Sequence, residues 1–189
     1  TQKVRDSLEG LESASFKGVR QVEDLLELSR IARNPRDKEP VALEPLAKQL
    51  GDELVFGKRD RYEVASLPTV MSNKALLESI LCNLVTNGFK FNNSSSKSVS
   101  VFWRKADQGG ELVVSDNGIG IEQKYYDQIF KVFKRLQGDD KYDGTGAGLA
   151  IVNRAARAVG CEMHLRSTPG KGTEFSVFFP DHLILESEG

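Results

Sequence analysis

A run of seven residues at positions 34–40, Asn-Pro-Arg-Asp-Lys-Glu-Pro, divides the sequence into two parts with different patterns. Proline has no backbone N–H and clashes with the preceding helical turn, so a helix cannot continue through two closely spaced prolines. The residues before the run are patterned as one helix, and those after it alternate between helical and extended patterns. We therefore expect a helical piece at 1–33, a linker at 34–40 and a mixed domain that begins at 41.

The helical piece carries a stripe of apolar residues at spacings of three and four over about thirty positions. The stripe consists of Val4, Leu8, Leu11, Val19, Val22 and Leu26. A single helix cannot bury its own stripe, so it needs a partner from the rest of the chain or from a second copy. We favour one half of an antiparallel helical pair in an oligomeric bundle over a docked or flexible appendage.

The mixed domain has the pattern of an α+β sandwich with one face of its sheet covered. We expect helices at 43–54, 73–91 and 146–158, and strands at 61–70, 98–105, 111–115, 161–167 and 173–179. Ser72 or Asn73 is available to cap the second of these helices, and Gln108-Gly109-Gly110 predicts a hairpin turn. The domain is expected to end at 180 and to be followed by a tail at 181–189.

Composition excludes several classes of protein. The 189 residues, 39% apolar and 28% charged, are sufficient for one core, and 26 Lys and Arg against 27 Asp and Glu give a net charge of −1. This balance gives no electrostatic case for nucleic acid or anionic lipid as a partner. No apolar run approaches the roughly 20 residues that span a bilayer. Cys82 and Cys161 form no disulfide framework or metal-ligand spacing. We expect a cytoplasmic protein.

The helix at 73–91 carries an unusual polar stripe. At 100° per residue, Asn83, Asn87 and Lys90 fall within about 60° of one another, beside the apolar face that must meet the core. An amide oxygen is a suitable ligand for Mg²⁺, and an ammonium group can meet phosphates as a point charge. Taken alone, the stripe is explained more simply as a solvated helix edge.

A second segment, 113–121, ends a strand at Asp116 and continues with Gly118 and Gly120. A buried aspartate can accept a hydrogen bond from the exocyclic amine of adenine, and glycines let the backbone approach a flat ring. An ordinary Asp-Asn-Gly turn explains this segment equally well.

A third segment, 144–149, opens a helix with glycines at alternate positions. Unobstructed N–H groups at a helix N-terminus suit a phosphate chain. The spacing differs from the dinucleotide-binding and Walker patterns, which argues against an oxidoreductase. The polar segment of about 25 residues that precedes it has the length of a lid, with Phe130 and Phe133 expected to anchor its base.

In this order the segments resemble the catalytic, ATP-binding domain of sensor histidine kinases, within the GHKL ATPase superfamily. The matching segments are 83–91 for the asparagine box, 116–121 for the first glycine box, 130–133 for the phenylalanine box and 144–149 for the second glycine box. Residues 22–30 resemble the second helix of the dimerisation and phosphotransfer hairpin. Residues 133–136, together with Tyr142, are similar to phytochrome-type kinases.

The resemblance implies a Bergerat-type α/β sandwich that binds ATP and Mg²⁺. It implies Asn87 as the metal ligand and Asn83, Lys90 and Arg135 as catalytic contacts to the triphosphate, with Arg135 at the γ-phosphate. Phe91 would stack on adenine, and Asp116, beside Thr173, would read its amine. The other ATP-binding residues implied are Gly118, Gly120, Ile121, Phe130, Phe133, Gly144, Thr145, Gly146, Gly148 and Leu149.

Kinases of this family phosphorylate a histidine on the first helix of the hairpin, and this chain has no such histidine. His164 lies in an expected strand and His182 in the expected tail. The resemblance implies transfer to a histidine on a helix absent from this chain, then to the receiver domain of a response regulator, in a homodimer formed through the helical bundle. A non-catalytic ATP-sensing dimerisation module, a degenerate kinase, remains the alternative.

Hydrolytic members of the superfamily form a competing class. They place a glutamate, the general base, one helical turn before the magnesium asparagine. Here that position is Asn83, whose amide cannot take a proton from water, and Glu78 points about 140° away on the helix. Transfer to a positioned acceptor is therefore favoured over hydrolysis.

Overall fold

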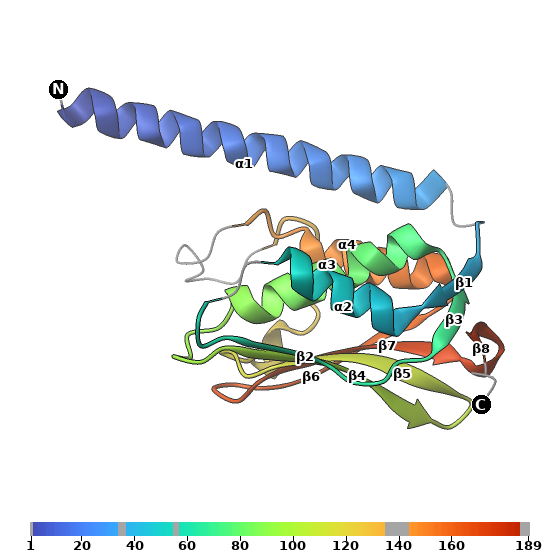
Figure 1. Ribbon diagram of the computed structural model, residues 1–189. Helices are drawn as coiled ribbons and strands as arrows, with labels where there is room; N and C mark the ends of the chain where they lie inside the picture. The colour runs from blue at the N-terminus through green and yellow to red at the C-terminus, as the bar shows by residue number, and fades with distance from the viewer. Residues whose placement is uncertain (1, 34–36, 55–56, 135–143, 186–189) are drawn as a thin grey trace.

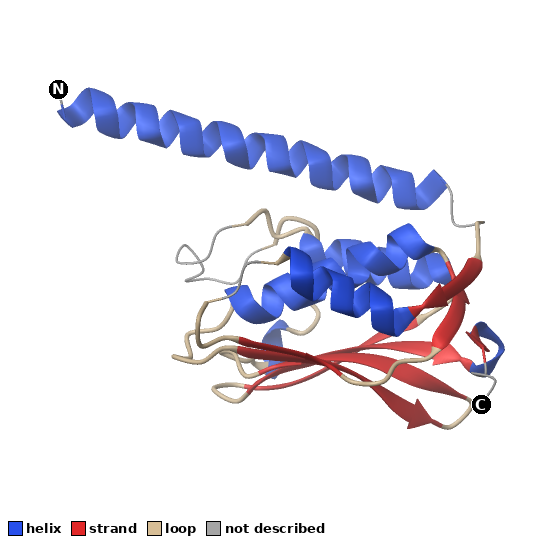
Figure 2. Ribbon diagram, viewed as in Figure 1, coloured by secondary structure: helices blue, strands red, loops and turns tan. Residues whose placement is uncertain are grey.

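The computed structural model describes residues 2–33, 37–54, 57–134 and 144–185. Helices and strands alternate along the chain, as Figures 1 and 2 show. They are α1 (Gln2–Arg33), β1 (Glu39–Ala42), α2 (Leu43–Glu53), β2 (Arg61–Val64), β3 (Thr69–Ser72), α3 (Lys74–Lys90), β4 (Ser98–Ala106), β5 (Gly109–Asp116), the 3₁₀ turn η1 (Gln123–Tyr125), α4 (Gly148–Val159), β6 (Glu162–Thr168), β7 (Gly172–Pro180), the 3₁₀ turn η3 (Asp181–Leu183) and β8 (Ile184–Leu185). The expected α+β class is confirmed.

The larger sheet has five strands in the order β2-β4-β5-β7-β6. β2 runs parallel to β4, and the other neighbours are antiparallel. Within the described part of the chain, α2, α3 and α4 cover one face of this sheet and no helix covers the other (Figure 2). The expected apolar face of α3 is buried between these layers, with Leu77, Ile80 and Leu84 at most 1% exposed. The sandwich is therefore built as the sequence predicts.

A smaller sheet of three strands, in the order β1-β3-β8, closes one end of the domain. The extended segment predicted at 61–70 is divided between the two sheets, since β2 belongs to the larger one and β3 to the smaller. β1 begins at Glu39, within the segment read as a linker, and residues 34–36 lie outside the described residues. Leu183 of η3 is 3% exposed, so the packed unit extends beyond position 180.

The predicted turn between β4 and β5 is wrong in one respect. Gly109 and Gly110 pair with Ala106 and Lys105 inside the hairpin, so the turn itself is formed by residues 107–108. A Cβ on Gly109 would lie 2.2 Å from the carbonyl oxygen of Phe179. A Cβ on Gly110 would lie 2.2 Å from the Trp103 ring. The two glycines permit close packing within the sheet. The sequence does not reveal this role, because glycine is also common in turns.

The long helix α1 is confirmed, and its described side chains pack on the domain toward its C-terminal end. Leu28 and Ile31 join the core at 6% and 4% exposure, and α1 contacts α4. The predicted apolar stripe, from Val4 to Leu26, remains 52–67% exposed. Among the described residues no helix is long and apolar enough to cross a membrane.

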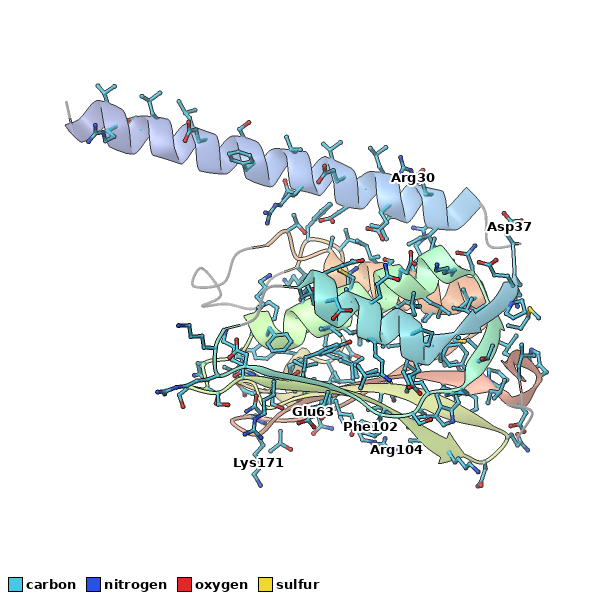
Figure 3. The ribbon with its side chains drawn as sticks, in the orientation of Figure 1. Arg30, Asp37, Glu63, Phe102, Arg104 and Lys171 are labelled. Carbon is cyan, nitrogen blue, oxygen red and sulfur yellow. The ribbon has the colours of Figure 1, made fainter. Side chains whose placement is uncertain are left out.

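A charged network lies on the face of the sheet away from the helices, where Figure 3 labels Arg104 and Phe102. Glu111 is 6% exposed and accepts hydrogen bonds from Arg104 at 3.0 Å and from Ser176 at 3.1 Å. His164 Nδ1 lies 3.0 Å from the same carboxylate, and Arg104 also forms two hydrogen bonds to Glu174. These partners allow a carboxylate to be buried on the sheet face away from the helices.

Candidate functional site

Most of the site residues expected from the sequence converge on one pocket of about 270 Å³, bounded by α3, the start of α4 and the segment after β5. The expected residues in its wall are Asn83, Asn87, Lys90, Phe91, Asp116, Gly120, Ile121, Gly144, Thr145, Gly146, Gly148, Leu149 and Thr173. Gly118, Phe130 and Phe133 are described but do not line it. Arg135 lies outside the described residues.

The two asparagines of α3 face the first turn of α4. α3 begins where Asn73 accepts the N–H of Leu76 at 3.1 Å, which confirms the predicted cap. Further along α3, Asn83 donates its Nδ2 to the carbonyl of Ser79, one turn earlier in the same helix, at 2.9 Å. This bond fixes the amide so that Oδ1 lies 2.6 Å from the position of a Cβ on Gly148. The glycine leaves space next to an amide oxygen that can accept a ligand donor or coordinate a cation.

Lys90 and Phe91 end α3 at the same wall. The Nζ atom of Lys90 lies 4.6 Å from the centroid of the Phe91 ring. A Cβ on Gly144 would lie 2.3 Å from this ammonium, so the glycine allows the chain before α4 to pass directly over the charge. The structure thus places a cation beside the backbone segment in which the sequence predicts phosphate-binding N–H groups.

Asp116 ends β5 with its carboxylate held by backbone donors. Oδ1 accepts the N–H of Gly118 at 2.7 Å and the N–H of Thr173 at 3.2 Å. Burial raises the pKa of Asp116 from 3.8 to about 6, although these two N–H groups act in the opposite direction. Thr173 is therefore beside Asp116 as expected, and its hydroxyl lies 3.0 Å from that of Ser167. A partly desolvated acceptor of this kind can select a ligand that presents an N–H donor.

Gly118 and Gly120 shape the segment after Asp116. A Cβ on Gly118 would lie 2.4 Å from the carbonyl oxygen of Phe91, and one on Gly120 would lie 2.2 Å from that of Thr168. The backbone of Gly120 also has φ +70, a conformation that residues with a side chain rarely adopt. Gly118 therefore positions the segment against α3 although it does not line the pocket.

The prediction for the lid base is only partly correct. Phe130 is half-buried against the core, but the Phe133 ring is 38% exposed and its residue has φ 58. The backbone of Phe133 makes the anchor instead, because its N–H donates to the carbonyl of Gly146 at 3.1 Å. Ile129, which is 8% exposed, supplies the apolar contact to the pocket.

The sequence interpretation missed several residues of the wall. They are Asp24, Thr86, Ile119, Ile129, Lys134 and Phe175. Ile119 lies within the segment 113–121, Phe175 lies within the expected strand 173–179 and Ile129 directly precedes Phe130, so their positions could have suggested them. Asp24 lies on α1, and its carboxylate accepts a hydrogen bond from the hydroxyl of Thr145. No pattern in the sequence relates these two positions, because their contact depends on how α1 docks.

The arrangement fits a purine attached to an anionic chain bound with a divalent cation. Asp116 offers an acceptor for an amine in a wall shared with Phe91 and Ile121, which are apolar. Lys90 and the glycine segment 144–148 offer positive charge and N–H groups, and Asn83 offers an amide oxygen beside an open position. These donor types suit phosphate and Mg²⁺.

Comparison with known sequences identifies the family. The family described as "Histidine kinase-, DNA gyrase B-, and HSP90-like ATPase" matches residues 72–183. Phytochrome-like protein Cph1 of Synechocystis sp. is 36% identical over 62% of this chain and 16% of that protein. Phosphate regulon sensor protein PhoR of Pseudomonas aeruginosa is 30% identical over 87% of this chain and 39% of that protein. The chain thus spans less than half of the length of these relatives.

Solved structures agree with the sequence matches. Full-length ShkA in complex with AMPPNP has a TM-score of 0.69 and 26% identity over 95% of this chain and 40% of that chain. The mycobacterial sensor histidine kinase MprB has a TM-score of 0.65 and 25% identity over 76% of this chain and 97% of that chain. This chain therefore belongs to the histidine kinase-, DNA gyrase B- and HSP90-like ATPase family, and sensor histidine kinases are among its relatives.

Proposed function

We propose that this domain binds ATP in the pocket between α3 and α4 and transfers the γ-phosphoryl group to a histidine on a helix outside this chain. The observation that carries the proposal is the amide of Asn83, one turn before Asn87 in the pocket wall. Its Nδ2 donates to the carbonyl of Ser79, and an amide has no basic atom that could take a proton from water. Glu78 is 50% exposed, lies 3.7 Å from Lys74 in an ion pair and does not line the pocket.

The roles of individual residues are part of the proposal. Asn87 would supply an amide oxygen to Mg²⁺, which in such sites also binds the phosphates and neutralises charge during transfer. Asn83 and Lys90 would hold the triphosphate, with Arg135 at the γ-phosphate. Asp116 would accept the adenine amine, while the other glycine-segment and apolar residues of the wall hold the phosphate chain and the ring.

Neither histidine of this chain occupies the position of an acceptor. His164 lies in β6 with Nδ1 bonded to Glu111, on the sheet face away from the pocket. His182 lies in the short η3 turn and is exposed. This supports an acceptor outside the chain.

The partners proposed are a second copy of the protein and the receiver domain of a response regulator. The exposed apolar stripe of α1, 52–67% exposed from Val4 to Leu26, supports a helical bundle as the dimer contact. The relatives named as sensor proteins support the receiver domain. We place this activity in the cytoplasm, where ATP is available to the site.

Calorimetric titration with ATP, with and without Mg²⁺ and with GTP as control, tests the binding step. We expect saturable, adenine-selective binding that Mg²⁺ strengthens, and equal affinity for ATP and GTP would contradict the role of Asp116.

The transfer step is tested with γ-labelled ATP and a longer form of the protein that carries the preceding helix. Acid-labile, alkali-stable protein phosphate is the expected product. Release of inorganic phosphate alone would indicate hydrolysis, and ATP binding with neither product would favour the ATP-sensing alternative.

A further inference from the structure

The pocket wall contains an acidic side chain at the segment where the proposed function places phosphates. Asp24 is half-buried on α1 and lines the pocket together with Thr145, Gly146 and Gly148. The C-terminal half of α1 lies along α4 in Figure 1, and the two helices are in contact. A carboxylate of one element therefore reaches the glycine segment of another.

A chain of hydrogen bonds connects this carboxylate to the N-terminal end of α4. The N–H of Ala147, the residue that precedes α4, donates to the hydroxyl oxygen of Thr145 at 3.3 Å. The same hydroxyl donates to the carboxylate of Asp24. The positive end of a twelve-residue helix is thus turned toward an anion of the protein itself. A nucleotide phosphate would use this same end of the helix.

Few other contacts between described residues hold α1 in this position. Leu28 and Ile31 are buried, and Glu27 accepts a hydrogen bond from Ser79 on α3. The apolar residues nearer the N-terminus of α1 remain exposed. Docking of α1 is consequently a limited contact that a modest change in free energy can reverse.

We propose that Asp24 is a built-in competitor of the nucleotide phosphates, so that docking of α1 and binding of ATP oppose each other. The proposal rests on the proposed function, which assigns residues 144–148 to the phosphates. Two anions at one helix end repel each other, and the Thr145 hydroxyl and the first turn of α4 cannot stabilise both at once. By linkage, ATP weakens the docking of α1 by the same factor as docking weakens the binding of ATP.

The charge of Asp24 is tested by calorimetry with the whole chain and the variant Asp24→Asn. The amide keeps an acceptor oxygen for Thr145 and removes only the charge. We expect ATP to bind about 5- to 20-fold more tightly to the variant, in the range of ordinary coupling between sites. Adenosine, which lacks phosphates, should bind both proteins equally. Glu23→Gln is the matched control, because Glu23 is the adjacent, exposed acid of α1 and does not line the pocket.

Each outcome supports or overturns the proposal. Equal ATP affinity of Asp24→Asn and Glu23→Gln, with adenosine bound by both, overturns the competition and leaves the proposed function standing. Weaker ATP binding by Asp24→Asn, in Mg²⁺ or in EDTA, also overturns it, because the carboxylate would then assist binding. If no form of the protein binds ATP, the proposed function fails and the inference fails with it.

Hydrogen exchange of α1 gives a second readout that a purely structural role of Asp24 would not change. In the wild-type chain, ATP should accelerate amide exchange at 24–31, whereas adenosine should not. Slower exchange in this segment with ATP would mean that the nucleotide strengthens docking, which contradicts the proposal.

Discussion

Oδ1 of Asp116 accepts the backbone N–H of Gly118 at 2.7 Å, and the N–H of Thr173 reaches the same oxygen at 3.2 Å. Among the described residues no hydrogen bond to Oδ2 is present, so a proton taken up by this carboxyl goes to Oδ2. A protonated Oδ2 is a hydrogen-bond donor at the position where the adenine amine, itself a donor, needs an acceptor.

This geometry predicts that adenosine affinity depends on pH. The pKa of Asp116 is raised to about 6 by burial, so the carboxylate is present at neutral pH and is lost as the pH falls through about 6. We expect the affinity to fall by up to about tenfold per pH unit below that value. The same raised pKa favours folding below the ordinary value of 3.8, and this contribution to stability is lost as the pH rises through about 6.

Calorimetry of the wild-type chain and of Asp116→Asn checks this. The variant should bind adenosine more weakly at neutral pH, with little change of affinity down to about pH 5, and should discriminate less between ATP and GTP. A wild-type affinity that stays constant over the same range would show that Asp116 does not contact the base.

Gly148 predicts a second effect, on the phosphate side of the pocket. A Cβ at this position would lie 2.6 Å from Oδ1 of Asn83, whose amide is held by Ser79. Gly148→Ala should therefore displace the amide and lower ATP affinity by about tenfold, a loss of about 1.4 kcal/mol. Titration with ATP measures this.

Gly51→Ala is the control for a clash of the same size elsewhere. Its Cβ would meet the Tyr62 ring at 2.6 Å, and neither residue lines the pocket. We expect a lower melting temperature and unchanged ATP affinity. Equal ATP affinity of Gly148→Ala and the wild type would show that the Asn83 amide is not a ligand contact.

The parts of the site that the sequence predicts are those carried by a single element. Asn83, Asn87 and Lys90 share a helix, so the period of the helix alone places them together. The carboxylate of Asp116 and the glycine segment 144–148 come from separate elements. Their residue types suggested a role for each, and their order along the chain, which resembles a known family, related them to one site.

The parts that the sequence could not predict depend on contacts between distant elements. Asp24 reaches the pocket only because α1 docks through Leu28 and Ile31, a few residues beyond the predicted stripe. Phe133 has the apolar character of an anchor, yet its positive φ accompanies an exposed ring and a backbone bond to Gly146. Residue type shows what a side chain prefers to contact, but the backbone conformation decides whether it does so.

Asn87→Ala tests the proposed metal ligand. Loss of the amide oxygen should lower the Mg²⁺-dependent affinity for ATP at least about tenfold, since even the loss of groups that only orient metal ligands lowers metal affinity by that factor. The fold should survive, because Asn87 lies at the pocket surface and outside the core. ATP titrations in Mg²⁺ and in EDTA separate the metal effect from direct phosphate contact.

Asn93→Ala is the matched control for that experiment. Asn93 is an exposed amide just beyond α3 that does not line the pocket. The Asn93→Ala variant should bind Mg-ATP with the same affinity as the wild type. If Asn87→Ala loses affinity equally with and without Mg²⁺, the side chain contacts the nucleotide directly and the metal ligand lies elsewhere.

The network on the outer face of the sheet predicts an effect on stability. Burial alone would raise the pKa of Glu111, but hydrogen bonds from His164, Ser176 and Arg104 outweigh it and the pKa is lowered. A carboxyl with a lowered pKa stabilises the fold above its ordinary pKa, and this contribution is lost as the pH falls through the folded-state value. Arg104→Met removes one of these donors and should lower the free energy of unfolding by about 1–3 kcal/mol at neutral pH.

Urea denaturation of Arg104→Met and Arg166→Met checks this stability effect. Arg166 is 69% exposed and lies 3.7 Å from Glu174, so its loss should change stability by no more than about 0.5 kcal/mol. The deficit of Arg104→Met should shrink at acidic pH, because the carboxylate left without its guanidinium then becomes protonated. If the two variants are equally stable at neutral pH, the burial of Glu111 does not depend on Arg104, and the bonds from His164 and Ser176 are sufficient to hold it.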